Sequence, residues 1–166
     1  MRRQGVVGTG WVPLWFIYPF FGIHMLAFGV SGFFLAYAVQ PVDYTALYMH
    51  GGIAIAVYLV FYLAIFGVDR VGWMFANAAL GILGIHAQIG WILARFGKRI
   101  EDYPWQVHVI PVLYYVLYTF LLRQFLIDVT HSRGNRARRN LVDAAYVVLS
   151  LAVYGLLLAR TRAGGG

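Results

Sequence analysis

The chain has 166 residues, of which 61% are hydrophobic and only 11% charged, and it carries a formal net charge of +7 with no cysteine. These proportions are typical of an integral membrane protein and exclude an ordinary soluble domain. The lack of cysteine excludes disulfides and thiolate ligands, and because basic residues gather at the ends of apolar runs, the positive charge indicates membrane topology rather than nucleic-acid binding.

Five apolar runs are each long enough to cross a hydrocarbon core of about 30 Å, which takes roughly 20 helical residues. They cover residues 11–38, 45–68, 71–96, 105–129 and 141–158. Because most connections are short, consecutive helices are expected to be antiparallel neighbours. We predict an all-α integral membrane protein with a single transmembrane domain over residues 1–166, built as an up-down bundle of five transmembrane helices.

The last predicted helix differs from the others because it contains no histidine. It follows the longest connection, residues 130–140, which holds four arginines and is predicted to be a solvated basic loop. We expect this helix to pack peripherally and to be the one least connected to any site.

The basic residues also predict the orientation. With the N-terminus in the cytoplasm, eight of them are inside, namely Arg2, Arg3, Arg70, Arg123, Arg133, Arg136, Arg138 and Arg139. Five are then outside, namely Arg95, Lys98, Arg99, Arg160 and Arg162. Since cytoplasmic segments carry an excess of Lys and Arg, this favours a multi-pass protein of the cell (inner) membrane with a cytoplasmic N-terminus.

Four histidines lie in apolar runs, one in each of the first four: His24, His50, His86 and His108. Ionisable side chains are costly inside a bilayer and by default mark a functional site. At about 1.5 Å per residue, His50 and His108 lie roughly 5 to 8 Å below the outer boundary, and His24 and His86 roughly 15 to 21 Å below it. The depths therefore match in two pairs.

This match predicts paired ligands for a metal or macrocycle. In a four-helix bundle the first and third helices are diagonal, as are the second and fourth, and one imidazole from each can hold a flat macrocycle between them. We predict that His24 with His86, and His50 with His108, are axial ligands of haem b, with room for two haems. The alternative for each histidine is an interhelical hydrogen bond. His131, in the basic loop, is expected to be solvated.

The neighbours of the histidines are compatible with a bulky ligand. Gly22-Ile23-His24 and Gly84-Ile85-His86 share a tripeptide whose glycines leave space for a ligand or for helix packing. Gln88 is a candidate second-shell partner of a site around His86, although Gln88 and Asn77 can instead make interhelical hydrogen bonds. Five tyrosines can line a cofactor or quinone pocket, or can pack and face lipid: Tyr58, Tyr62, Tyr114, Tyr115 and Tyr118.

Several functional classes lack the residues that they need. The carboxylates fall in loops or near run ends, which disfavours a carrier that uses a deep carboxylate. Lys98, the single lysine, lies in a loop, so a retinal Schiff base within the bundle is excluded. No serine or threonine lies in a nucleophile motif.

With one histidine on each of four helices, the chain resembles in organisation the five-helix dihaem cytochrome b anchors of succinate dehydrogenases and fumarate reductases. The resemblance is architectural, because the histidine spacings are uneven and no family motif transfers residue roles. We expect a b-type haem protein that transfers electrons with a quinone or a partner redox subunit, as a non-catalytic subunit of an oxidoreductase.

Two alternatives remain open. In one, the histidines bind (bacterio)chlorophyll or pack without any cofactor, and the chain is an accessory subunit of a respiratory or photosynthetic complex. In the other, they line a metal-ion channel or carrier. The small size and the lack of a soluble domain favour a part of a complex or a homo-oligomer.

Overall fold

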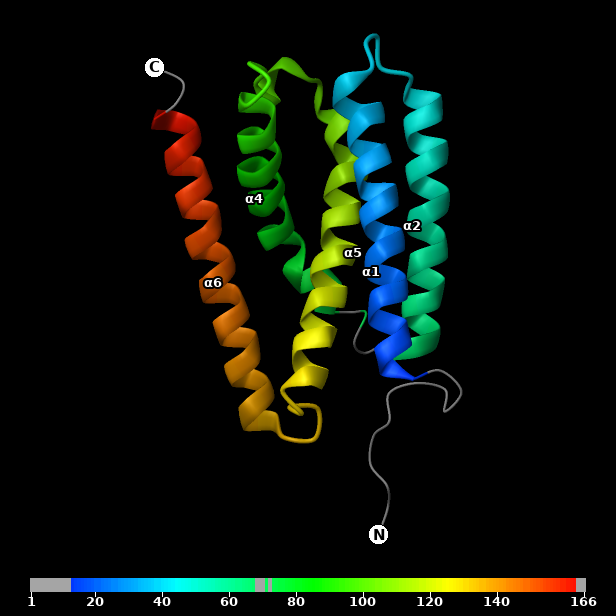
Figure 1. Cartoon of the computed structure of the whole chain (residues 1–166), viewed down its shortest axis with the longest axis vertical. Coiled ribbons are helices and arrows are strands. Elements are labelled where there is room, and N and C mark those ends of the chain that lie inside the picture. Colours follow the sequence, from blue (N-terminus) through cyan, green and yellow to red (C-terminus); the bar gives the residue numbers. More distant parts are fainter. Residues whose placement is uncertain (1–12, 68–70, 72, 164–166) are drawn as a thin grey trace.

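The computed structural model describes residues 13–67, 71 and 73–163, without the side chains of residues 14, 75–77 and 162. The described elements are all helical: α1 (Leu14–Phe33), the π-helix η1 (Phe34–Ala38), α2 (Tyr44–Phe66), α4 (Trp73–Ala94), the 3-10 turn η2 (Ile100–Asp102), α5 (Trp105–Val129) and α6 (Arg136–Ala163) (Figure 1). The predicted all-α class with five helices is confirmed. Predictions that rest on Arg2, Arg3, Arg70, Arg162 and Asn77 fall outside the described part.

Within the described part of the chain, four helices are long and apolar enough to span a membrane: Trp15–Ala38, Tyr44–Phe66, Trp105–Val129 and Arg136–Thr161. The fifth, α4, contains a shorter apolar stretch, Ala78–Ala94. A bilayer core offers no water to backbone groups, so helices that satisfy their own hydrogen bonds are the structure expected for such runs. These four helices indicate a multi-pass membrane protein in a lipid bilayer.

Short polar and glycine signals set the helix ends. The Asp43 carboxylate caps α2 by accepting a hydrogen bond from the Ala46 amide at 3.0 Å. Gly67 ends α2 with a φ of 85°, a left-handed conformation that glycine adopts without steric cost. Helix α4 runs in the opposite direction to α2, in keeping with the up-down order of the bundle (Figure 1).

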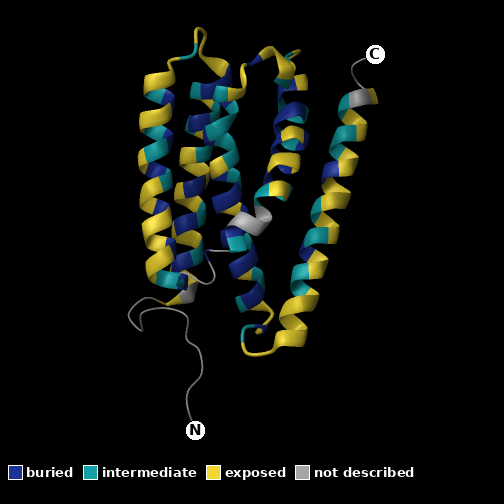
Figure 2. Ribbon diagram, turned by 180° about the vertical axis from the view of Figure 1, so that it is seen from behind, coloured by how far each residue is buried: buried dark blue, intermediate teal, exposed yellow. Residues whose placement is uncertain are grey.

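Helix α5 lies at the centre of the bundle, where it packs against α1, α2, α4 and α6 (Figures 1 and 2). Its buried residues extend over its whole length, from Val107 to Ile127. The diagonal arrangement assumed in the sequence analysis is therefore wrong, because α2 and α5 pack directly on each other. The prediction assumed that four of the helices form a square. In the five-helix bundle α5, the fourth predicted helix, instead contacts each of the other four helices.

Helix α6 is peripheral, as predicted, and most of its surface is exposed (Figure 2). It begins at Arg136, within the predicted basic loop, where the Asn135 side chain accepts a hydrogen bond from the Arg138 amide at 3.1 Å. The predicted start of this helix, residue 141, was the start of the apolar run. The helix itself begins five residues earlier, in polar residues that precede that run. The helix is also well connected: Asp143 pairs with Arg123, and the Tyr154 hydroxyl bonds that of Tyr115.

A second polar cluster joins α1 to the end of α5. The Tyr18 hydroxyl donates to the Asp128 carboxylate, which also pairs with Arg133 in the loop after α5. The Arg133 guanidinium reaches the Gln124 amide oxygen at 3.4 Å. Charged groups near hydrocarbon are tolerated when they are paired, so this cluster fixes one end of the bundle and need not be a ligand site.

Candidate functional site

His24 is exposed on α1 with one ring nitrogen already bonded. Its Nδ1 lies 2.7 Å from the Phe20 carbonyl oxygen, and its ring packs on the Phe20 ring at 4.2 Å between centroids. Because a carbonyl oxygen only accepts, Nδ1 carries the hydrogen, and in the neutral imidazole Nε2 holds the lone pair. In metal-binding histidines a hydrogen bond of this kind, from the ring N–H to a backbone carbonyl, usually fixes the tautomer and the orientation of the ring.

A groove of about 410 Å³ lies between α1 and α2, and both His24 and His50 line it. The other lining residues are apolar or aromatic: Phe20, Phe21, Phe28, Met49, Ile53, Ala54, Val57, Tyr58 and Phe61. None of these described residues is Lys or Arg. The groove therefore combines two imidazoles with flat hydrophobic walls, which is a surface suited to the face of a macrocycle.

His50 makes a hydrogen bond that the sequence analysis left open as an alternative. Its Nε2 lies 2.9 Å from the Ser31 hydroxyl oxygen. That hydroxyl already donates its hydrogen within α1, to the carbonyls of Ala27 and Phe28. When the hydroxyl donates within α1, His50 Nε2 is the donor to Ser31 and carries the hydrogen, and Nδ1 then holds the lone pair. Ser31, the single serine in α1, was the available sequence signal for this contact.

His108 is tied to the π-helix at the end of α1. Its Nδ1 lies 2.8 Å from the Tyr37 hydroxyl, and the two rings stack at 5.7 Å. The Tyr37 carbonyl accepts hydrogen bonds from Lys98 Nζ at 3.1 Å and from the Tyr103 hydroxyl at 2.9 Å. These contacts join η1, α5 and the connection after α4, and they give His108 an interhelical role that sequence reasoning offered only as an alternative.

His86 is exposed on α4 and lines neither the groove nor the cavity described below. Gln88 faces a different direction, since residues two apart on a helix do not share a face. Its Nε2 donates to the Tyr115 hydroxyl at 3.3 Å, so it serves Tyr115 instead of a site around His86. His131 is exposed in the loop after α5, as expected.

The structure thus brings His24 and His50 to one groove, but places His86 and His108 elsewhere. A cavity separates α1 from α4, and neither the His24 nor the His86 ring lines it. Within the described residues, no group of three or more His, Cys, Asp or Glu side chains is arranged to hold a metal ion.

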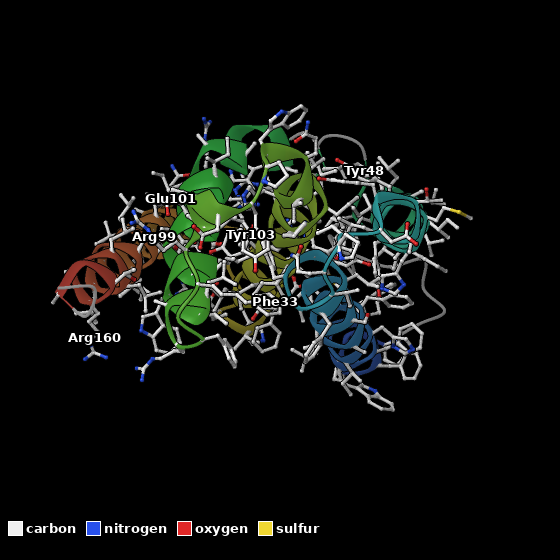
Figure 3. The ribbon with its side chains drawn as sticks, turned by 90° about the horizontal axis from the view of Figure 1, so that it is seen from above. Phe33, Tyr48, Arg99, Glu101, Tyr103 and Arg160 are labelled. Carbon is white, nitrogen blue, oxygen red and sulfur yellow. The ribbon has the colours of Figure 1, made fainter. Side chains whose placement is uncertain are left out.

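That cavity, of about 430 Å³, lies between α1, α4 and α5. Its walls are mainly apolar and contain three of the tyrosines named from the sequence, Tyr114, Tyr115 and Tyr118. The labelled Phe33, another wall residue, lies between the ribbons of α1 and α4 in the view from above (Figure 3). Tyr58 lines the α1–α2 groove instead, and Tyr62 is a core residue whose hydroxyl contacts Met25 Sδ at 2.9 Å.

Comparison with known proteins identifies no matching family model, no similar curated protein and no similar solved structure.

Proposed function

We propose that the protein is a membrane-embedded electron-transfer subunit that holds a haem b in the α1–α2 groove through His24. The observation that carries the proposal is the orientation of the His24 ring, whose Nδ1 is bonded to the Phe20 carbonyl while the groove offers about 410 Å³ beside it. A haem held between two imidazoles carries one electron at a time and leaves no position for oxygen. A quinone or a partner redox subunit would exchange that electron.

The groove favours a different pairing from the one predicted by depth. His50 lines the same groove as His24, whereas His86 does not. To act as the second ligand through Nε2, His50 would have to give up its hydrogen bond to Ser31, a loss of about 1 kcal/mol. That cost is small beside the coordination of a metal, so the pair that we propose is His24 with His50.

The absorption spectrum of the purified protein tests the proposal. Sharp reduced-minus-oxidised haem bands are expected for the wild type. His24→Ala and His50→Ala should each lower the haem content roughly tenfold or more, since even second-shell changes at metal sites have effects of that size. His86→Ala changes another exposed histidine, in the same Gly-Ile-His context as His24, and should retain the haem. A wild-type protein without haem bands contradicts the proposal, and loss of haem in His86→Ala restores the depth-based pair.

One observation favours a second candidate, an accessory subunit that binds a chlorophyll-type pigment. Haem b carries free propionates, which are costly to bury without a partner, and none of the described groove residues is Lys or Arg. An esterified tetrapyrrole on His24 avoids that cost. Far-red absorption bands, in place of haem bands, would identify this alternative.

The proposed orientation has a direct test because the chain has no cysteine. The loop between α5 and α6 lies at the same end of the bundle as the start of α1, opposite the connection after α4 (Figure 1). With a cytoplasmic N-terminus in the inner membrane, Glu101→Cys should react with an impermeant maleimide in intact cells, and Arg138→Cys only after lysis. The reverse labelling pattern would invert the orientation.

A further inference from the structure

The cavity between α1, α4 and α5 contains a buried hydroxyl that lacks a hydrogen-bond partner. Tyr114 lines this cavity, is only 6% exposed, and its hydroxyl oxygen is buried with no hydrogen-bond partner. An unpaired polar group in an apolar interior costs about 1 to 3 kcal/mol. The described part of the chain supplies no acceptor for this hydroxyl, whose oxygen has almost no accessible surface, so an acceptor bound in the cavity reaches it only when the Tyr114 side chain shifts toward the cavity.

The neighbouring tyrosine is a useful contrast. Tyr115 also lines the cavity, but its hydroxyl bonds the Tyr154 hydroxyl of α6 and accepts from Gln88. The chain therefore satisfies one of two adjacent tyrosines on α5 and leaves the other unsatisfied. The ring of Tyr114 packs edge-on against Tyr58 of α2, at 6.4 Å between centroids.

The depth of Tyr114 restricts the ligand. It lies nine residues beyond Trp105, the first residue of α5, or about 14 Å along the helix axis. This is near the middle of a hydrocarbon core of about 30 Å, whereas the ester carbonyls of phospholipids lie in the interfacial region. An acceptor at this depth belongs to a molecule that dissolves in the bilayer core.

The cavity walls define the polarity and the size of the ligand, and the side from which it enters. They are mainly apolar, and the exposed Leu26, Val30 and Tyr118 form part of them, so the cavity reaches the lipid-facing surface. Gly29 and Gly32 of α1 also line it, and a Cβ atom built at either would meet no atom within 4 Å. A volume of about 430 Å³ is within the range of small-molecule sites.

We propose that this cavity binds an apolar, bilayer-dissolved carbonyl compound of the quinone class, whose carbonyl oxygen accepts a hydrogen bond from the Tyr114 hydroxyl. The ligand enters sideways from the membrane past Leu26 and Val30, and its ring lies among the aromatic walls. The site is separate from the α1–α2 groove and requires no haem there, so it stands or falls independently of the proposed haem site.

Thermal unfolding of the purified protein in detergent, titrated with decylubiquinone, measures this binding, because a ligand of the folded state raises its stability by RT ln(1 + [L]/Kd), where [L] is the free quinone concentration and Kd its dissociation constant. For the wild type we expect the unfolding midpoint to rise with the logarithm of the quinone concentration once that concentration exceeds the dissociation constant. Tyr114→Phe should weaken the quinone about tenfold, the value of one hydrogen bond. The same variant without ligand should be no less stable than the wild type. Tyr58→Phe, on the neighbouring face of α2, should leave the affinity unchanged.

A cavity-filling variant provides an independent arm. Gly29→Leu places a side chain in open cavity space and should abolish saturable binding. Gly52→Leu is the matched control, because Gly52 is also helical and unobstructed but does not line the cavity. Equal binding by Gly29→Leu and the wild type would overturn the proposal, as would unchanged affinity in Tyr114→Phe. A comparable increase with dioleoylphosphatidylcholine would overturn the quinone assignment, since the occupant would then be a lipid ester.

Discussion

Replacing Arg123 by methionine is expected to lower the free energy of unfolding by about 3 kcal/mol, because it leaves the Asp143 carboxylate without its partner. Arg123 Nε and Nη2 each donate to a different carboxylate oxygen of Asp143 at 2.7 Å. The Arg123 side chain is only 8% exposed, and its guanidinium lies 4.0 Å from the centre of the Trp73 ring. One side chain thus connects α5, α6 and α4. The free energy of unfolding in mixed detergent micelles measures how much this side chain contributes to stability.

A double variant separates the ion pair from its desolvation cost. In Arg123→Met with Asp143→Leu no charge remains unpaired, so much of the lost stability should return. If the double variant is instead as unstable as the sum of both single variants, the pair contributes through contacts other than its charges. Arg99→Met, which breaks the exposed pair with Glu101 visible in Figure 3, should have almost no effect.

Adding one methyl group to α2 should have opposite effects at two adjacent glycines. A Cβ atom at Gly51 would overlap Ile110 Cγ2 and lie 3.2 Å from Ile110 Cβ, whereas one at Gly52 meets nothing within 4 Å. Overpacking typically costs about 1 to 3 kcal/mol, and alanine gains up to about 1 kcal/mol over glycine in a helix. We expect Gly51→Ala to destabilise the protein by about 2 kcal/mol and Gly52→Ala to stabilise it slightly.

Ile110, which a Cβ atom at Gly51 would overlap, provides the control for these two glycine variants. Ile110→Ala removes the overlapping methyl group, so in the Ile110→Ala background Gly51→Ala should cost little or nothing. The same detergent unfolding assay applies to all of these variants. A full cost of Gly51→Ala in both backgrounds would show that α2 and α5 are not packed at Gly51 as described.

The helices were predictable from the sequence, but their partners were not. Long apolar runs separated by short connections determine that helices form and alternate in direction, and the structure has all five. Which helices touch depends on small local fits, such as Gly51 against Ile110, that composition does not reveal. The start of α6 was missed for a related reason, since a helix can continue through polar residues once it leaves the hydrocarbon.

For the candidate sites too, the sequence predicted the position of each residue along its helix but not the residues that it contacts. Depth along a helix follows from residue number, so the match of His24 with His86 was available from the sequence. Each residue also turns the helix face by 100°, because there are 3.6 residues per turn, and the faces of His24 and His86 do not meet in one pocket. The unpaired hydroxyl of Tyr114, beside the fully bonded Tyr115, could be found only from packing.

The central place of α5 has a consequence for how the chain is made. Among the described helices α5 is synthesised after α1, α2 and α4, yet these three and α6 all pack against it. In a membrane, inserted helices associate after each has become stable alone. Until α5 arrives, α1, α2 and α4 keep their α5-facing surfaces in lipid, including the exposed backbone edge at Gly51. A nascent chain that ends before Trp105 should therefore be a substrate for membrane proteases, whereas one that extends through Ala163, with α6 packed and Arg123 paired with Asp143, should resist them.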